Sequence, residues 1–448
     1  MKVLDSEILA SLKKQITDAM QKQAAVALAE LIRERNPLRV VFLVSDGLKG
    51  TIGRQCCQYL HQQGILTELL GEGDEFPSQE ADVIVDALET AGEGLLRAAN
   101  EAFGHRLSIL VPCGIDIDNG AIRGEVFEAA ETVCFDHPLS GLYLYPGSDH
   151  RGRITVLEGP FKEADIDSYL AVNSLTEVIN KLPVRRKHSH KGTYGKVLLI
   201  AGSPGKSGAC KLCGQAILRS GAGLLTVMVP RDILLTVENG LWEAMTVSYG
   251  DDWKQAADDI DFSQYTTVVL GCGLGRDQRS EYLMIKALES PCDLLLDADG
   301  LYHLGKHLDL LKREALTVIT PHEVEYQRVF PLKRETLLKD LEEITCRYPS
   351  LIIVLKGEHT ITASHRLITF NTTGNDALAK GGSGDVLAGL IGGLIAQKPD
   401  YDSVTAGVYL HSLAADRWIE KHSRYSLTAR DIIREYDDII VEATGGPR

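Results

Sequence analysis

Asn371-Thr-Thr-Gly-Asn375 and Lys380-Gly-Gly-Ser-Gly-Asp385 precede the apolar stretch Val386-Leu-Ala-Gly-Leu-Ile-Gly-Gly-Leu-Ile-Ala396. The apolar stretch is long enough for a buried helix, which predicts that residues 382–385 form the helix N-terminus. Free backbone N–H groups and the helix dipole make such an end an anion site, and glycines let a phosphate approach the backbone. Asp385 is then placed to deprotonate a hydroxyl that attacks a phosphoryl group. The alternative is that Asp385 only caps the helix.

Polar and glycine-rich motifs follow several predicted strands upstream of that segment. The strands are predicted at residues 196–201, 224–229, 267–270, 293–296, 317–319 and 351–355. The motifs that follow four of them are Gly271-Cys-Gly-Leu-Gly275, Asp297-Ala-Asp299, Thr320-Pro-His-Glu323 and Lys356-Gly357. Each motif alone is also explained by turn chemistry. Because ligands of open α/β sheets bind outside the carboxyl ends of the strands, their joint placement predicts a nucleotide-dependent site.

A second α/β pattern precedes this one. Strands are predicted at residues 39–44, 81–87 and 107–112, and a helix at residues 55–63. Strands that alternate with helices predict a parallel sheet covered on both faces. The expected fold is therefore α/β, with two three-layer αβα domains at residues 1–160 and 187–448 and a linker at residues 161–186.

The charge distribution argues against nucleic-acid binding. Lysine plus arginine total 47 against 62 aspartate plus glutamate, and the net charge of -15 would repel a phosphate backbone. The exception is the basic cluster at residues 185–191, Arg-Arg-Lys-His-Ser-His-Lys. We interpret this cluster as a solvated part of the linker; the alternative is a phosphate-attracting rim beside the nucleotide site.

Length and composition are those of an ordinary globular protein. The 448 residues, 44% of them hydrophobic and 24% charged, predict two or three domains of about 150 residues. The apolar stretches are far shorter than the roughly 20 residues of a membrane span, and residues 1–20 lack the apolar core of a signal peptide. We therefore expect a cytoplasmic protein without membrane contact. The nine cysteines form no disulfide framework, and Cys210 and Cys213 are expected to pack in a helix rather than to carry redox chemistry.

The order and spacing of these motifs resemble the dehydratase domain of the bifunctional NAD(P)H-hydrate repair enzymes, a branch of the ribokinase-like superfamily. The resemblance runs from about Lys187 to the C-terminus. Besides the motifs quoted above, the matching segments are His190-Lys-Gly192, Gly195-Lys-Val-Leu-Leu-Ile-Ala-Gly-Ser203, Arg219-Ser-Gly-Ala-Gly-Leu-Leu-Thr226 and Leu410-His-Ser-Leu-Ala-Ala-Asp416. The resemblance implies a ribokinase-like C-terminal domain and a homo-oligomeric protein.

The reaction implied by this resemblance is a metal-assisted, ADP-driven dehydration of the S form of hydrated NADH or NADPH. Its products are the intact dinucleotide, AMP and phosphate. The implied cofactors are ADP, as phosphoryl donor, and Mg²⁺, whose protein ligands the motifs do not identify. The preference between ADP and ATP, and between the two hydrates, is left open.

Site residues follow from the same resemblance. Asp385 is implied to be the base for the C6 hydroxyl, and the amides of Gly382, Ser383 and Gly384 to stabilise the transferring phosphoryl group. The hydrate pocket is implied to contain Ala209, Gly273, His322 and Asp385. The nucleotide site is implied to contain Lys356, Gly357, Glu358, His359, Thr360 and Gly384, with Asn371 and Asn375 as further candidates. Lys356 is expected to be an exposed lysine whose removal affects ADP binding more than folding.

Two segments depart from the family pattern. The family usually continues Asp-Ala-Asp with Ala-Leu-Asn, and Thr-Pro-His with Pro-Gly-Glu. This chain has Gly300-Leu301-Tyr302 and Glu323-Val324-Glu325 at these places. The differences concern pocket details and leave the main catalytic segment intact.

The first domain resembles the Rossmann-like epimerase domain that precedes the dehydratase in these enzymes and equilibrates the R and S hydrates. The family's Gly-Asn-Asn-Gly-Gly-Asp-Gly loop matches Gly47-Leu-Lys-Gly-Thr-Ile-Gly53. The expected catalytic Asp and Lys match Leu110 and Leu139. Since leucine cannot carry out acid–base chemistry, we expect a degenerate epimerase domain that keeps a scaffold or ligand-sensing role.

Two other functions stay open on the residues alone. One is a true small-molecule kinase of the same superfamily, because the glycine-rich turn and its helix serve phosphoryl transfer there too. The ordered His-Lys-Gly and Thr-Pro-His segments argue against it. The other is a non-catalytic nucleotide-binding protein in which both domains have decayed, and the presence of Asp385 argues against that.

Overall fold

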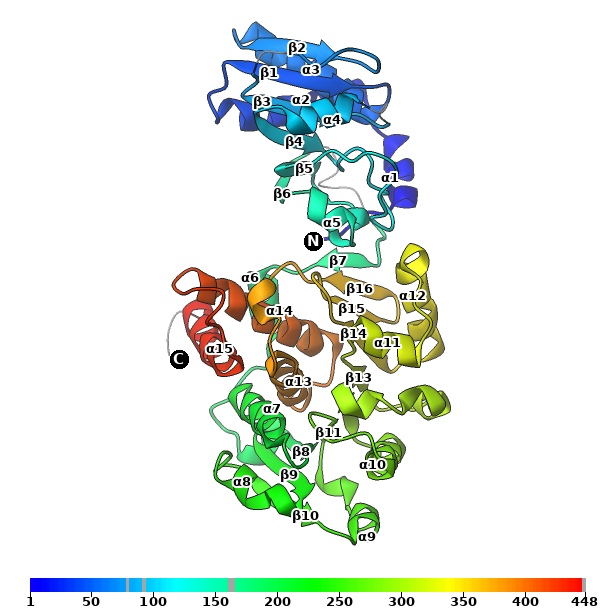
Figure 1. The fold of residues 1–448 in the computed structure, drawn as a ribbon, viewed down its shortest axis with the longest axis vertical. Helices are drawn as coiled ribbons and strands as arrows, with labels where there is room; N and C mark the ends of the chain where they lie inside the picture. Colours follow the sequence, from blue (N-terminus) through cyan, green and yellow to red (C-terminus); the bar gives the residue numbers. More distant parts are fainter. Residues whose placement is uncertain (78–79, 91–93, 160–165, 445–448) are drawn as a thin grey trace. The chain divides into compact units, whose positions relative to one another are not determined.

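The computed structural model describes residues 1–77, 80–90, 94–159 and 166–444, and the chain divides into two compact units (Figure 1). Unit 1 comprises Met1–Ala171 and Arg334–Thr336; unit 2 comprises Val172–Lys333 and Leu337–Arg448. Residues 161–165 of the expected linker lie outside the described residues, and its later part contains β7 (Leu170–Val172) and α6 (Leu175–Lys181). Val178 of α6 is buried in an apolar cluster of unit 2, so this part of the connector is packed structure.

Unit 1 is built on a six-stranded parallel sheet of order β2-β1-β3-β4-β5-β6. The strands are β1 (Arg39–Val44), β2 (Leu66–Leu70), β3 (Val83–Ala87), β4 (His105–Ile109), β5 (Glu131–Phe135) and β6 (Arg153–Leu157). The helices are α1 (Ser6–Lys13), α2 (Asp18–Arg33), α3 (Leu48–Gln62), α4 (Leu95–Glu101) and α5 (Gly147–His150). Val41 and Leu43 of β1 pack in one cluster with α4, whereas Gly53 of α3 lies against Val44 on the opposite face. Helices thus cover both faces, as the αβα prediction requires.

The sheet of unit 2 has the order β10-β9-β8-β11-β12-β13-β14-β15-β16. Its strands are β8 (Lys196–Ile200), β9 (Leu224–Pro230), β10 (Met245–Tyr249), β11 (Thr267–Leu270), β12 (Asp293–Leu296), β13 (Thr317–Ile319), β14 (Leu351–Leu355), β15 (Ile361–Ser364) and β16 (Leu367–Phe370). Strands β8 to β14 pair in parallel, and only the β14–β15 and β15–β16 pairs are antiparallel among those described here. The carboxyl ends of the parallel strands therefore share one edge, where the predicted motifs fall.

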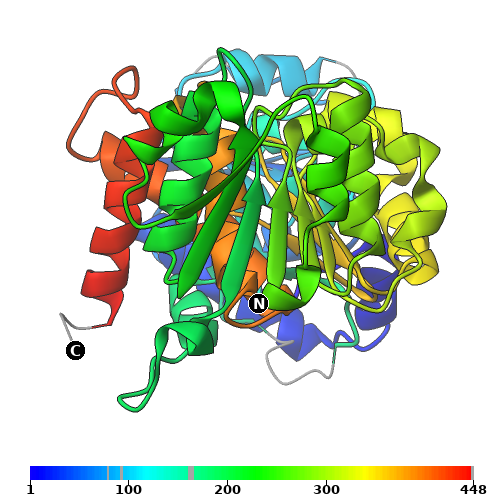
Figure 2. The ribbon, with the colours of Figure 1, turned by 90° about the horizontal axis from the view of Figure 1, so that it is seen from below.

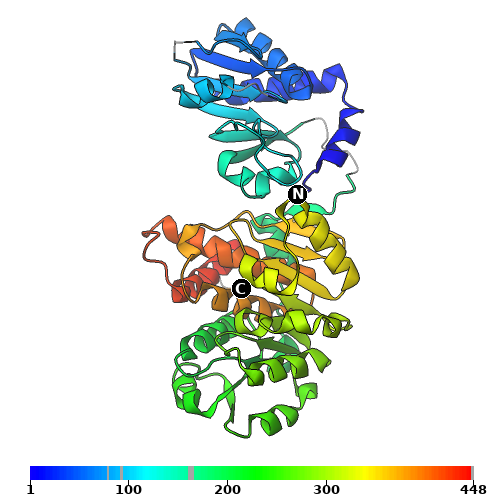
Figure 3. The same cartoon turned by 45° about the vertical axis from the view of Figure 1, so that its right-hand side comes forward.

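Helices cover both faces of this sheet (Figures 2 and 3). One side carries α7 (Ser207–Arg219), α8 (Leu234–Glu238), α13 (Ser383–Ile395), α14 (Tyr401–Ile419) and α15 (Ala429–Ala443). The other side carries α9 (Trp253–Asp258), α10 (Gln278–Glu289), α11 (Glu323–Val329) and α12 (Leu337–Arg347). Among the helices of the described residues, none has the length and apolar character that a membrane span requires.

Helix α13 is the buried helix predicted from the apolar stretch. Eleven of its residues are buried, among them every residue from Val386 to Ile395. Its glycines let α7 approach, because a Cβ on Gly389 would lie 2.4 Å from the carbonyl oxygen of Cys213. Cys210 and Cys213 are buried free thiols on α7, which confirms their packing in a helix. The position of Asp385 on the first turn of α13 thus rests on close helix–helix packing.

The basic cluster at residues 185–191 lies beside the amino ends of β8 and β9. The Arg185 guanidinium donates to the Gly221 carbonyl, and its carbon lies 4.2 Å from the centre of the Tyr194 ring. The Tyr194 carbonyl in turn accepts from the Gly223 amide, directly before β9. The cluster is exposed and occupies the edge of the sheet opposite to the strand-end motifs. This geometry favours a solvated segment over a phosphate-attracting rim of the nucleotide site.

Candidate active site

A cavity of about 990 Å³ lies at the carboxyl ends of β13 and β14 and beside the N-terminus of α13. The predicted site residues that line it are His322, Lys356, Gly357, Glu358, His359, Thr360, Asn371, Asn375, Ser383 and Gly384. Most of the predicted nucleotide residues therefore meet around one space large enough for a nucleotide. Ala209, Gly273, Gly382 and Asp385 are not among its lining residues.

The N-terminus of α13 is shaped by Gly382, whose φ of +94° is a left-handed conformation that favours glycine. His411 of α14 holds the next residue, with its Nε2 3.0 Å from the Ser383 carbonyl oxygen. Burial lowers the pKa of His411 to about 4, so the imidazole is neutral and carries its proton on Nε2. A Cβ placed on Gly384 would have the Lys356 ammonium as its nearest neighbour, at 3.7 Å. The helix end and the lysine thus face the same space.

Asp385, on the first turn of α13, is partly buried among acidic groups. Its burial, followed by the nearby Asp297 carboxylate, raises the pKa of Asp385 to about 6, although Cys272 and Lys356 oppose the rise. A carboxylate whose pKa lies close to neutral is better matched to general-base catalysis than an ordinary aspartate. Asp385 therefore has the electrostatics expected of the proposed base.

Lys356 differs from the sequence expectation of an exposed lysine. Its side chain is only 21% exposed, and its ammonium donates to Asp297 Oδ1 at 2.9 Å. Asp297 is 2% exposed and also accepts from the Thr320 hydroxyl at 2.7 Å. Burial alone would lower the pKa of Lys356, but the carboxylates of Asp297 and Glu325 raise it above its ordinary value. The expectation of an exposed lysine is therefore wrong, and because the buried Asp297 carboxylate is paired with Lys356, we expect its removal to affect folding.

Asp297 and Asp299, predicted from the sequence only as a strand-end motif, form a polar centre in the structure. Asp299 accepts from the Gly275 amide at 2.9 Å and forms ion pairs with Lys206 and Arg276 at 3.0 and 2.7 Å. Ala298 between them has a φ of +49°, an uncommon conformation for a residue with a side chain. The signal available in the sequence was the pair of acids directly after a buried strand.

The predicted hydrate residues occupy two places. Gly273 and Ala209 are neighbours, since a Cβ on Gly273 would lie 3.1 Å from the Ala209 Cβ. His322 instead caps the N-terminus of α11, where its Nδ1 accepts from the Glu325 amide at 3.3 Å. Its side chain is half exposed and lines the cavity.

Asn371 and Asn375 shape the loop before α13. The Asn371 side-chain amide donates to the Thr373 carbonyl at 2.7 Å, and that of Asn375 donates to Asp416 Oδ1 at 2.8 Å. The other oxygen of Asp416 accepts from the Gly374 amide at 2.7 Å. Asp416 and His411 both lie in the Leu410-to-Asp416 segment of the family resemblance. Their contacts, which the sequence analysis did not assign, position the loop and the helix end.

One group of possible metal ligands occurs within the described residues. Cys272, Asp297 and Asp385 offer ligand atoms that lie within 4.8 Å of one another. A thiol is a soft ligand, whereas Mg²⁺ prefers oxygen ligands in octahedral geometry, and Asp297 already binds Lys356. These three residues therefore do not fit a magnesium site built from protein ligands alone.

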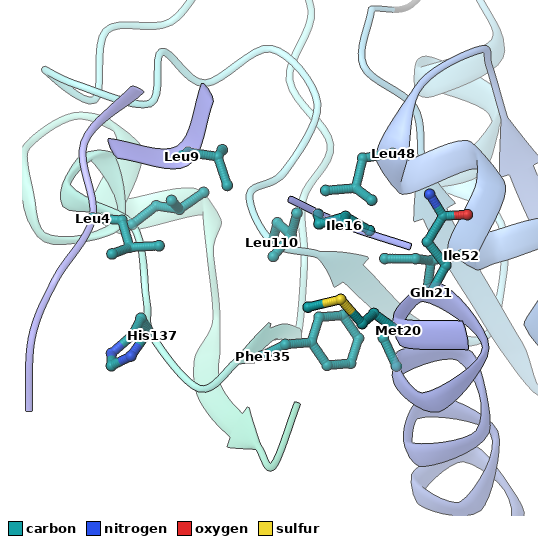
Figure 4. Close-up of a pocket in the computed structure, with 12 residues that line it drawn as sticks. Leu4, Leu9, Ile16, Met20, Gln21, Leu48, Ile52, Leu110, Phe135 and His137 are labelled. Atoms are coloured by element: carbon teal, nitrogen blue, oxygen red, sulfur yellow. The ribbon is translucent and has the colours of Figure 1, made fainter. Parts of the chain in front are cut away.

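Unit 1 brings its replaced epimerase positions together in a separate, apolar cavity (Figure 4). Leu48, Ile52, Leu110 and Leu139 all line it, and Figure 4 shows Leu110 among Ile16, Met20 and Phe135. Its remaining lining residues are Leu4, Leu9, Gln21, Ala24 and His137. The free volume is about 20 Å³, which is room for about one water molecule.

Comparison with known proteins gives consistent matches. Residues 197–437 match the family model described as NAD(P)H-hydrate dehydratase. A bifunctional NAD(P)H-hydrate repair enzyme from Coxiella burnetii is 33% identical over 79% of this chain and 75% of its own length. An ADP-dependent (S)-NAD(P)H-hydrate dehydratase from Bacillus subtilis is 35% identical over 56% of this chain and 91% of its own length.

Solved structures match the second unit's type of fold. An ADP/ATP-dependent NAD(P)H-hydrate dehydratase from Bacillus subtilis, co-crystallised with ATP and Mg²⁺, aligns with a TM-score of 0.54 at 32% identity, covering 61% of this chain and 98% of that one. A ribokinase-like superfamily protein from Enterococcus faecalis aligns with a TM-score of 0.56 at 27% identity, covering 61% and 96%. The C-terminal part of this chain therefore has the expected ribokinase-like α/β fold.

Proposed function

This chain belongs to the NAD(P)H-hydrate dehydratase family, and we propose that it repairs NADH and NADPH by ADP-dependent dehydration of their (6S)-hydrates. The observation that carries the proposal is Asp385 on the first turn of α13, with a pKa raised to about 6 and with Lys356 close by. In this proposal Asp385 takes the proton of the C6 hydroxyl while that oxygen attacks the β-phosphoryl group of ADP. AMP leaves. The C6–O bond of the phosphorylated hydroxyl then breaks, phosphate departs, and loss of a proton from the adjacent ring carbon to solvent re-forms the double bond of the dihydronicotinamide.

The binding roles extend this proposal to the rest of the site. Lys356 and the 357–360 loop, which line the cavity, would hold the nucleotide, and the Ser383 and Gly384 amides would face the transferring phosphoryl group. Gly273 and Ala209 would contact the hydrate. Mg²⁺ would neutralise phosphate charge as a complex with the nucleotide, since it usually binds phosphates with few protein ligands. A homo-oligomeric, cytoplasmic enzyme is part of the same proposal.

Incubation of the full-length protein with ADP, Mg²⁺ and NADH hydrate should restore the absorbance of the dihydronicotinamide ring. AMP and phosphate should appear in amounts equal to the NADH recovered. Parallel reactions with ATP and with NADPH hydrate would measure the two preferences. A small-molecule kinase would leave the hydrate unrepaired, and a non-catalytic protein would bind ADP in calorimetry without any turnover; either result would refute the proposal.

For unit 1 the proposal is a degenerate epimerase domain. The side chains at the positions of the family's acid–base pair, Leu110 and Leu139, face an apolar cavity too small for a nicotinamide ring. Leu110 keeps a φ of +65°, which is an outlier for a bulky residue. Strained backbone conformations are typical of active sites. A leucine that keeps this conformation therefore supports the descent of this position from a catalytic residue.

The full-length protein without ADP is expected not to accelerate the interconversion of R and S hydrates. Without ADP the proposed dehydratase reaction cannot proceed, so any loss of one epimer measures epimerisation alone. Chromatography of the two forms over time, beside a no-protein sample that gives the spontaneous rate, is the measurement. A rate clearly above that sample would mean that another acid–base pair has taken over in unit 1.

A further inference from the structure

Cys272 lies between the two acidic groups of the site. It follows β11 between Gly271 and Gly273, and its side chain is fully buried. Its Sγ donates to Asp297 Oδ2 at 3.9 Å and lies within 4.8 Å of a carboxylate oxygen of Asp385. The opposite oxygen of Asp297 is the one that accepts from Lys356 and Thr320. The thiol therefore contacts the Asp297 oxygen opposite to the one that Lys356 and Thr320 contact, and it also lies close to Asp385.

Two carboxylates so close together repel each other when both are ionised. Lys356 neutralises Asp297 directly, whereas the Cys272 thiol lies within 4.8 Å of a carboxylate oxygen of Asp385 and, together with Lys356, lowers the pKa of that group. The charged and titratable groups that face Asp385 are Asp297, Asp299, Lys356, Cys210 and Cys272. Of these, Cys272 is the neutral donor nearest to both carboxylates.

We propose that Cys272 is a positioning residue of the dehydratase, whose thiol proton is shared between Asp297 and Asp385 and keeps Asp385 ionised and oriented as the base. The proposal rests on the proposed function, in which Asp385 takes the hydroxyl proton. In this proposal Cys272, which is fully buried, acts through the two aspartates and contacts neither substrate nor nucleotide.

The thiol keeps its proton at every pH at which the enzyme would be assayed. A hydrogen bond with Cys213, then burial and nearby negative charge, raise the pKa of Cys272 well above its ordinary value. A protonated thiol is a weak hydrogen-bond donor, but a hydrogen bond is electrostatically stronger where water is excluded. The thiol therefore acts as a fixed dipole rather than as a titrating group.

The test is the pH dependence of kcat/KM for the full-length enzyme with ADP and NADH hydrate. The wild type should lose activity below a pH of about 6 as Asp385 is protonated. Cys272→Ala and Cys272→Val remove the donor, and both should move this acid limb upward by about half a pH unit or more. Val also fills the space of the thiol, so water that enters beside Ala cannot explain a shift common to both. Cys272→Ser keeps a hydroxyl donor and should restore the wild-type limb.

Cys292→Ala is the matched control. Cys292 is a buried thiol that donates to the Phe262 and Tyr265 carbonyls at 3.2 and 3.4 Å, before β12 and away from the acidic pair. Its profile should be unchanged. Ionisation of the ADP phosphates is common to all variants and cancels in the comparison.

Each outcome discriminates. An acid limb that stays in place or moves downward in both Cys272→Ala and Cys272→Val overturns the role of Cys272, provided that ADP binding shows both to be folded. A Cys272→Ser variant that behaves like Ala overturns it as well. Full turnover in an Asp385→Asn variant would instead show that Asp385 is not the base, which is a failure of the proposed function. The two failures can be told apart because this one is measured without any cysteine variant.

Discussion

Replacing Asp385 by Asn is expected to lower dehydratase turnover by about 10²- to 10⁴-fold, the usual cost of losing a positioned general base. The amide has the shape of the carboxylate but cannot accept the hydroxyl proton. ADP should still bind, because the proposed nucleotide contacts come from Lys356, the 357–360 loop and the α13 amides rather than from Asp385.

Stability should not fall in this variant. The pKa of Asp385 is raised to about 6 in the fold, so above that pH the charged form costs folding free energy, and this cost is absent when the acid is protonated. A neutral Asn removes that cost, and the melting temperature at pH 7.5 should be equal to or above that of the wild type.

Single-turnover measurement of NADH recovery, with ADP affinity measured by calorimetry, would separate chemistry from binding. Asp437→Asn is the matched control, because Asp437 lies exposed on α15 and its ion pair to Arg219 is long, at 3.9 Å. Wild-type turnover in Asp385→Asn would show that another group accepts the proton. Loss of both turnover and ADP binding would show that the change damaged the helix end.

The sequence predicted the parallel core of unit 2 closely, and the reason is local. Strands β11 to β14 are short apolar runs between polar turns, and their observed bounds coincide with the predicted ones. The edge strands were missed. Met245 and Val247 of β10 are exposed, so the strand lacks a buried apolar run. β15 and β16 form a hairpin around Arg366, which has a φ of +59°. A glycine at such a position would have indicated a turn, but the sequence has an arginine there.

In the site, too, features that depend on neighbouring residues were predicted, whereas contacts between residues far apart in the chain were not. The helix end at residues 382–385 belongs to one continuous segment of sequence, and it forms as predicted. The partnership of Lys356 with Asp297 joins residues 59 apart in the chain, and the proximity of Cys272 to Asp385 depends on how β11 and α13 meet. Strand-end motifs indicated that these residues share one edge. Only packing decides which of them touch, and this is why Lys356 was expected to be exposed.

Lys356→Ala is therefore expected to weaken both folding and ADP binding. Removal of the ammonium leaves the Asp297 carboxylate, which is 2% exposed, with the Thr320 hydroxyl as its remaining short contact on Oδ1. Removing one partner of a buried ion pair typically costs about 3–5 kcal/mol, and the partial exposure of Lys356 places the expected loss near the lower end. ADP affinity should fall about 10- to 100-fold, the equivalent of about 1.5–3 kcal/mol for a hydrogen bond to a charged group.

The double variant Lys356→Met with Asp297→Asn separates these two effects. It removes both charges and fills the space of the lysine stem, so most of the lost folding free energy should return in urea unfolding. ADP affinity in calorimetry should stay low, because neither new side chain carries a positive charge to meet the phosphates. If affinity returned together with stability, Lys356 would act on the nucleotide only by holding the fold. If the single variant already bound ADP like the wild type, the phosphates would have to lie away from β14.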